Sequence, residues 1–245
     1  MHPVILNTRP ALQSENLTRL LSDAGMQVYH LPVLAIQPTL FSSPNFTEID
    51  YVIFLSANAV THFFSHTSSS ELNSTRIIAI GSATQTALLH HGLKNILLPN
   101  IFNSEGILAM PCLQNISQKN ICIISGENPK PLLTQMLLKR GATIKNIYCY
   151  KRICNQDISP DELKNLLNKN IDFIISTSVN SLQCLINLFE RSHQLPWLCN
   201  KCFCLINQDM KTYALKHGIS KIIIAENATD AAICDAIKTS IRGEV

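Results

Sequence analysis

The side chains in this sequence that could do chemistry are hydroxyl, amide and glycine residues that follow short apolar runs. The set comprises Thr8 and Arg9, Ser56 and Asn58, Gly81 and Thr84, residues 125–128, and Thr177, Ser178 and Asn180. In open α/β sheets such residues lie at the carboxyl ends of the strands, where helices begin and ligands bind. Helix N-termini direct free N–H groups at that edge, so the pattern predicts an anion-binding site. Taken singly, each side chain is more simply a helix cap.

The sequence lacks several common catalytic motifs. The sequence shows no paired carboxylates, no Ser/His/Asp order and no phosphate loop of the Gly-x-x-x-x-Gly-Lys type. We interpret His62, His66, His90 and His91 as surface residues. A site of hydroxyls, amides and backbone donors suits a substrate that supplies its own reactivity.

Cysteine usage also argues against a metal site. Cys199 and Cys202 have the spacing of half a zinc site, but no second Cys/His pair follows them, so we predict no metal. Most of the nine cysteines lie within apolar runs and are expected to be small core residues in a reducing compartment. These include Cys122, Cys149, Cys184 and Cys234.

Composition is that of an ordinary globular protein. Of 245 residues, 46% are hydrophobic and 15% are charged, and the net charge is only +3. Dispersed charge of this size argues against a nucleic-acid partner but not against a small polyanion. The sequence has no apolar run of membrane-spanning length and no recognisable signal peptide, so we expect a cytoplasmic protein without membrane contact.

The elements that would position these side chains alternate between strands and helices, which predicts parallel sheets built from βαβ units. The expected strands are 4–8, 28–31, 51–55, 76–80, 96–99, 121–124, 144–150, 171–175, 202–206 and 221–225. Residues 49–60 are echoed at 171–182, and residues 80–92 at 206–218. The unit that ends at Gly25 also resembles residues 121–141. We therefore expect an α/β protein with an internal duplication.

Several fragments, in this order and spacing, resemble the uroporphyrinogen-III synthase family over the full length of the chain. They are residues 4–10, 54–60, 79–84, 126–128, 140–142 leading to 148–152, and 172–178. The resemblance implies two parallel-sheet α/β domains joined by two extended linkers, near residues 34–39 and 151–156. One domain would combine residues 1–35 with 155–245, the other would span 39–150, and the cleft between them would hold the substrate.

The reaction implied by the resemblance is the cyclisation of hydroxymethylbilane to uroporphyrinogen III, with inversion of ring D through a spiro intermediate. The resemblance implies no metal or organic cofactor, and it implies a monomer in transient contact with hydroxymethylbilane synthase. Tyr150 matches the tyrosine expected to assist departure of the substrate hydroxyl, although it could equally be a linker aromatic that packs against a domain.

The resemblance implies that Ser56, Thr84, Ser178 and Arg9 contact the substrate. We add Asn58, Gly81 and Gly126 to the predicted substrate-binding residues. A structural salt bridge is the alternative role for Arg9.

Two departures from the family pattern keep other functions open. Met210 stands where many relatives have a threonine, and Ser125 stands where an arginine is common. We transfer no substrate contact to Met210. A non-catalytic two-domain protein that binds a small anion or a tetrapyrrole is the main alternative, and a degenerate relative acting as a scaffold is another.

Overall fold

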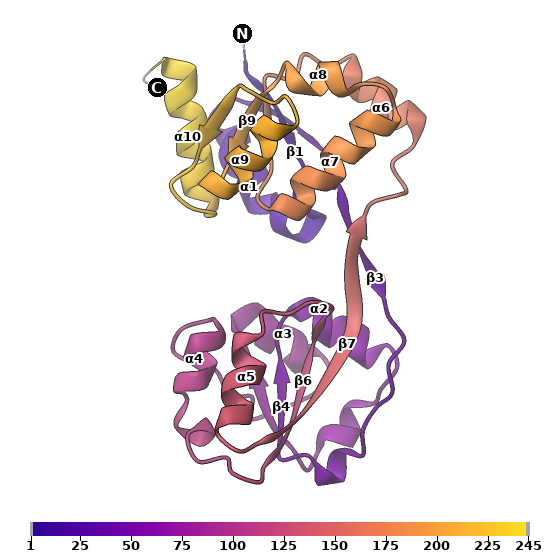
Figure 1. Ribbon diagram of the computed structural model, residues 1–245, viewed down its shortest axis with the longest axis vertical. Helices are drawn as coiled ribbons and strands as arrows, with labels where there is room; N and C mark the ends of the chain where they lie inside the picture. The colour runs from indigo at the N-terminus through magenta and orange to yellow at the C-terminus, as the bar shows by residue number, and fades with distance from the viewer. Residues whose placement is uncertain (1, 244–245) are drawn as a thin grey trace. The chain divides into compact units, whose positions relative to one another are not determined.

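The computed structural model describes residues 2–243, except for the side chain of Leu12. The chain divides into two compact units, which we describe separately. Unit 1 comprises residues 1–35 and 153–245, and unit 2 comprises residues 36–152. The path of the chain through both units can be followed in Figure 1. Unit 1 is therefore assembled from the two ends of the sequence.

Unit 1 is built on a five-stranded sheet in the order β10-β9-β8-β1-β2, in which each pair is parallel. Its strands are β1 (Val4–Asn7), β2 (Gln27–His30), β8 (Phe173–Ile175), β9 (Cys202–Leu205) and β10 (Ile222–Ile224). Side chains alternate between the two faces: Ile5 packs with one hydrophobic cluster and Leu6 with the other. Both faces are covered, so the strands read as continuous apolar runs.

Helices on each face of this sheet supply the rest of the core. One face packs against α1 (Ala11–Asp23) and α10 (Asp230–Arg242). The other packs against α6 (Pro160–Leu167), α7 (Val179–Arg191), α8 (Leu195–Cys199) and α9 (Gln208–Lys216). Ser159 caps α6 by accepting a hydrogen bond from the Glu162 N–H at 3.1 Å, and Pro160 occupies the first turn, where its missing N–H is not needed.

Unit 2 contains a second five-stranded sheet in the order β3-β7-β6-β4-β5. Its strands are β3 (Leu34–Pro38), β4 (Tyr51–Phe54), β5 (Arg76–Ala79), β6 (Asn120–Gly126) and β7 (Thr143–Cys154). The pairs β4–β5, β4–β6 and β6–β7 are parallel. The helices α2 (Ala57–Phe64) and α3 (Ser82–His90) cover one face, and α4 (Ser104–Ala109) and α5 (Leu132–Lys139) cover the other. Short 3₁₀ turns lie at Phe46–Glu48, Ser69–Leu72 and Pro111–Leu113.

The two sheets share one strand order, in agreement with the duplication expected from the sequence. The order β2-β1-β8-β9 in unit 1 corresponds to the order β7-β6-β4-β5 in unit 2. In this correspondence β8 matches β4, and each of these two strands is followed by a Ser-x-Asn segment, at residues 178–180 and 56–58. Both copies are therefore central strands of their sheets.

The expected strand at 96–99 is present only as an isolated parallel bridge between Ile78 and Leu97. Leu97 nevertheless extends the sheet beyond β5 at the position that β10 occupies in unit 1. The segment therefore lies beside β5, but its pairing is too short to count as a strand.

One cysteine prediction was wrong. Cys184 is not a free core thiol but forms a disulfide with Cys154, with the two Cα atoms 5.2 Å apart. The partner lies at the end of β7, 30 residues earlier in the chain. Cys122, Cys149 and Cys234 are buried and free, as expected. Burial raises the pKa of Cys122 to about 12, so its thiol stays protonated at neutral pH.

None of the helices within residues 2–243 has the length and the hydropathy that crossing a bilayer requires.

Candidate functional site

The carboxyl edge of the unit 2 sheet carries most of the predicted site residues. The strands β4, β5 and β6 are parallel and end at Phe54, Ala79 and Gly126. Ser56 and Gly81, which follow β4 and β5, are the N-caps of α2 and α3. The first N–H groups of each helix have no partner within that helix. This edge therefore combines hydroxyl groups with two positive helix ends.

Tyr150 is almost fully buried at this edge, with 4% of its surface exposed. Its phenol oxygen lies 3.0 Å from the Oγ of Ser56, in a hydrogen bond for which either group can be the donor. The same Ser56 oxygen accepts a hydrogen bond from the Ala59 N–H at 3.0 Å. The start of α2 thereby fixes the hydroxyl that contacts the tyrosine.

Gly126 is required by the position of Tyr150. A Cβ at residue 126 would lie 2.6 Å from the Tyr150 Cζ and 3.0 Å from its hydroxyl oxygen. The pairing of β6 with β7 shifts between Ser125 and Gly126, so that Gly126 pairs with Tyr150. Such an irregularity re-aims a side chain at the edge of a sheet. Here it brings the ring against a residue without a side chain.

His62 is a neighbour of Tyr150 that the sequence interpretation missed. Its ring centroid lies 5.7 Å from that of Tyr150, with the two planes tilted by 37°. Burial lowers the pKa of His62 below its ordinary value, and the charge of His66 lowers it further. The prediction of a surface histidine was therefore wrong for His62, which is half-buried. The signal available in the sequence was its place on the helix that begins at Ser56.

Thr84 and Asn58 occupy the first turns of α3 and α2. Thr84 is only 3% exposed, and its hydroxyl has no hydrogen-bond partner among residues 2–243. Asn58 is half-buried, and its side chain likewise makes no hydrogen bond within the described part of the chain. Gly81 caps α3 without a side chain. The side chains of Asn58 and Thr84 are therefore available as donors near the Ser56–Tyr150 pair. Asn58 follows the same strand as Ser56, and Thr84 follows the neighbouring strand β5.

Ser178 and Arg9 belong to unit 1, at the carboxyl edge of its own sheet, after β8 and β1. Ser178 caps α7 by accepting from the Ser181 N–H at 3.1 Å, and its hydroxyl lies 2.8 Å from that of Ser181. Arg9 forms an ion pair with Asp230, the first residue of α10. The structure thus shows a salt bridge at Arg9, the alternative that the sequence left open.

The ion pair of Arg9 shapes the protonation of Asp230. Burial alone would raise the pKa of Asp230, but hydrogen bonds from Asn16 and Arg9, together with the positive charge of Arg9, lower it overall. Among the described residues, the buried Nε of Arg9 has no hydrogen-bond partner. A substrate carboxylate at Arg9 would have to compete with Asp230 or reach this remaining donor.

The departure at Met210 is accommodated by packing. Met210 is fully buried in the core of unit 1, on the first turn of α9. Its N–H donates to the side chain of Asn207 at 2.9 Å, so Asn207 is the helix cap. Asp209, which directly precedes Met210 in the first turn of α9, is exposed. A buried thioether offers no hydrogen bond to a ligand, so this edge of unit 1 lacks one donor.

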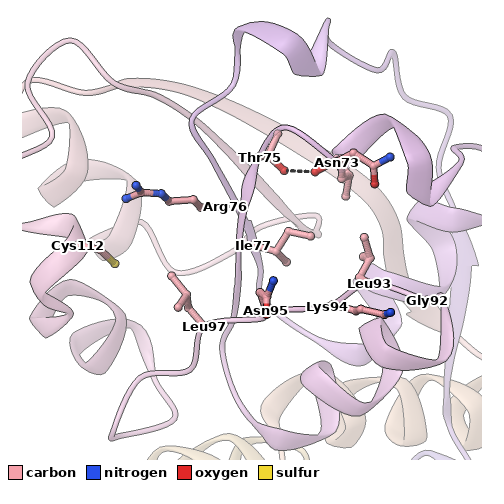
Figure 2. A pocket seen from close by; sticks show the side chains of 11 residues that line it. Asn73, Thr75, Arg76, Ile77, Gly92, Leu93, Lys94, Asn95, Leu97 and Cys112 are labelled. Atoms are coloured by element: carbon pink, nitrogen blue, oxygen red, sulfur yellow. Dashed lines mark hydrogen bonds between the residues drawn. The ribbon is translucent and has the colours of Figure 1, made fainter.

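A separate pocket of about 630 Å³ lies at the opposite end of β5 (Figure 2). Arg76, the first residue of β5, points toward Cys112 there, and Lys94 lies on the other side. The Arg76 guanidinium donates to the Tyr51 hydroxyl at 3.1 Å. None of the predicted site residues lines this pocket, so it is distinct from the site at the carboxyl edge.

Within residues 2–243, no three His, Cys, Asp or Glu side chains are placed to share a metal ion.

Comparisons with known proteins agree with one another. A family model described as uroporphyrinogen-III synthase HemD matches residues 15–235. The chain is 27% identical over 245 residues to uroporphyrinogen-III synthase of Escherichia coli (strain K12), covering 96% of this chain and 99% of that protein. It is 28% identical over 244 residues to uroporphyrinogen-III synthase of Salmonella typhimurium (strain LT2), covering 96% and 99%.

Solved structures show the same fold. Uroporphyrinogen-III synthetase from Helicobacter pylori 26695 aligns with a TM-score of 0.66 at 18% identity, over 99% of this chain and 100% of that chain. A mutant uroporphyrinogen III synthase from the extremely thermophilic bacterium Thermus thermophilus aligns with a TM-score of 0.55 at 14% identity, over 98% and 99%. The two-unit α/β architecture is therefore shared with these proteins.

Proposed function

Because the chain belongs to the uroporphyrinogen-III synthase family, we propose that Tyr150, Ser56 and the adjacent N-termini of α2 and α3 in unit 2 belong to its active site. The chain is an enzyme of tetrapyrrole biosynthesis, a lyase that cyclises hydroxymethylbilane. Its product is uroporphyrinogen III. We further propose that, as the resemblance implies, ring D is inverted through a spiro intermediate.

The observation that carries this assignment is the hydrogen bond of 3.0 Å between Tyr150 and Ser56 at the carboxyl edge. In the first step the pyrrole nitrogen supplies the electron pair that breaks the C–O bond of the substrate hydroxymethyl group. The departing hydroxyl takes up one proton and the pyrrole N–H releases one, so the net loss is water. The Tyr150 phenol donates a hydrogen bond to the departing oxygen, and Ser56 orients that phenol.

Binding of the polycarboxylate substrate falls to groups that are already oriented. The N–H groups of the first turns of α2 and α3 favour carboxylates, with Thr84 and Asn58 as additional donors. In unit 1, Ser178 at the start of α7 and Arg9 are the corresponding candidates. Holding a reactive chain in one conformation is the main task of such a site, because closure at the substituted position competes with closure elsewhere.

The proposal for Tyr150 is tested by the change Tyr150→Phe. Hydroxymethylbilane is generated in situ, and the oxidised products are separated by isomer, since spontaneous closure gives the type I ring. We expect the wild type to give type III and Y150F to lower kcat at least tenfold, because a positioned general acid usually contributes more than that. The melting temperature should change little.

Tyr148→Phe is the matched control. Tyr148 lies on the same strand but is 39% exposed, and no hydrogen bond joins it to Ser56 within the described residues. Y148F should keep the wild-type kcat. A Y150F enzyme with kcat within twofold of wild type would refute the assignment of Tyr150.

Three further statements belong to this proposal: that the enzyme is a monomer, that it is cytoplasmic, and that it contacts hydroxymethylbilane synthase transiently. The support for such a contact is chemical, because a substrate that closes spontaneously is best passed on quickly. Sedimentation velocity of the enzyme alone and with the synthase tests the first and the third. A stable dimer of the enzyme alone would refute the monomer.

A further inference from the structure

Two large apolar side chains are exposed beside the site of unit 2. Ile101 is 64% exposed and Phe102 is 57% exposed. They lie in the segment between Leu97, which bridges to β5, and the start of α4 at Ser104. Single exposed apolar residues are common on protein surfaces, but an adjacent pair next to a ligand site is informative.

Two glycines allow other segments to approach this pair closely. The Phe102 ring packs on Gly81, where a Cβ would lie 3.2 Å from the ring's Cγ. A Cβ at Gly106 would overlap the carbonyl oxygen of Ile101, so α4 also approaches the segment closely. The Asn103 N–H donates to that oxygen at 2.9 Å, and the Asn103 side chain accepts from the Gly106 N–H at 2.7 Å. The exposed side chains therefore sit on a fixed support.

Topology places the pair at the edge where the chemistry occurs. Leu97 runs parallel to Ile78 in β5, so the chain beyond Leu97 emerges at the same end of the sheet as the residues that follow β5. Gly81, which Phe102 touches, is the N-cap of α3, and Thr84 lies in the first turn of that helix. An apolar surface thus borders the free N–H groups of a helix N-terminus.

We propose that Phe102 and Ile101 form an apolar platform on which a pyrrole ring of the linear tetrapyrrole rests while one of its carboxylates reaches the start of α3. This inference rests on the function proposed above. Pyrroles are flat aromatic rings that carry acidic side chains, and they match an aromatic side chain beside an anion-binding helix end in both respects. The platform also assigns a role to Gly81, since a side chain there would push the Phe102 ring away.

The first test is the change Phe102→Ala, assayed with hydroxymethylbilane generated in situ. Loss of the ring should raise KM about five- to tenfold, the range expected for one aromatic contact. It should leave kcat and the melting temperature close to wild type, because the ring is exposed and touches no reacting bond. Phe102→Tyr should restore the wild-type KM, and Gly81→Ala should raise KM as F102A does.

Leu138→Ala is the matched control. Leu138 is 52% exposed on α5 of the same unit, and this helix ends at the opposite edge of the sheet. L138A should have no effect on KM.

A second measurement reports contact directly. The chain has one tryptophan, Trp197, so the double variant W197F/F102W carries a single tryptophan at the platform. Adding uroporphyrinogen III under nitrogen should quench its emission and shift it to shorter wavelength.

The outcomes separate this inference from the function proposed above. If F102A keeps its KM within twofold of wild type while Y150F loses turnover, the platform is refuted and the catalytic assignment stands. If both variants behave as wild type, the placement of the site at this edge is refuted as well. If the wild type self-associates in sedimentation and F102A does not, the pair is an interface between two copies of the chain and the platform is refuted.

Discussion

At the scale of single residues, the position of Tyr150 depends on neighbours from two other elements, α2 and β6. Ser56 from the start of α2 contacts its hydroxyl, Gly126 at the end of β6 lies under its ring, and His62 from α2 lies beside it. A buried tyrosine hydroxyl requires a hydrogen-bond partner, which Ser56 provides. The Tyr150 ring is therefore both a core residue and a member of the proposed site.

The contact with Gly126 predicts a sharp effect of Gly126→Ala. The added methyl group would lie 2.6 Å from the Tyr150 Cζ, so the ring must move. We expect the free energy of unfolding to fall by about 1–3 kcal/mol, the usual cost of overpacking, and kcat to fall with it. Denaturant unfolding and the coupled assay measure the two effects. Unchanged stability would mean that the ring can leave its place without cost.

His62 predicts a pH dependence of stability. Its folded-state pKa is lowered below the ordinary value of 6.5, so the unfolded chain binds the proton more readily. Wild-type stability should therefore fall as the pH drops below 6.5, down to the folded-state pKa. His62→Gln should lack this loss. Melting temperatures at pH 7.5, 6.5 and 5.5 test this, and a constant difference between the two proteins would contradict it.

At the scale of elements, the internal duplication supplies a matched pair of helix caps. Ser56 caps α2 and Ser178 caps α7 through the same N-cap to N3 bond. Only Ser56 also contacts a tyrosine. Ser178 instead contacts the hydroxyl of Ser181, and a serine within a helix can turn its hydroxyl to a backbone carbonyl of the same helix. The two variants should therefore differ mainly by the tyrosine contact.

We expect Ser178→Ala to cost about 0.5–2 kcal/mol of unfolding free energy, the usual range for a cap. Ser56→Ala should cost about 1 kcal/mol more, because the Tyr150 hydroxyl loses its partner in a buried place. Denaturant unfolding of the two variants checks the difference. Equal losses would show that the Tyr150 hydroxyl finds another partner.

Elements that depend on local pattern were predictable from the sequence. Apolar runs and capping residues located the strands and most helix starts, and repeated patterns indicated the duplication. The shared strand order became visible only in the structure. Contacts between distant segments were not predictable. Nothing local to Gly126 indicates that the pairing of β6 and β7 shifts there, and nothing local to Phe102 indicates that its ring rests on Gly81. Cys184 was misread because its pairing with Cys154 depends on how the end of β7 meets α7.

At the scale of the whole molecule, the disulfide lies within unit 1, where it joins the last residue of β7 to α7. Cys154 ends β7 and Cys184 lies within α7, 30 residues away in sequence. Closing a loop of this length stabilises a fold by roughly 3–4 kcal/mol in the chain-entropy model. The bond is formed between residues that are already packed in one hydrophobic cluster.

Cys184→Ser should therefore lower the free energy of unfolding by about 3 kcal/mol in oxidising buffer. With excess reductant the wild type and C184S should become nearly equal. Cys199→Ser, which changes a free and half-buried thiol, is the control and should have little effect in either buffer. Equal stability of wild type and C184S without reductant would show that the bond does not form in solution.

The discontinuity of unit 1 has a consequence for how the protein is made. Strand β1 lies between β2 and β8, so one of its edges stays unpaired until the ribosome has delivered β8. Roughly 140 residues separate His30 from Phe173, which at about 5–20 residues per second means a wait on the order of ten seconds. During that time all of unit 2 is synthesised and can close. During translation β1 is therefore an apolar strand with one unpaired edge, and we expect a chaperone at the ribosome exit to speed the folding of unit 1.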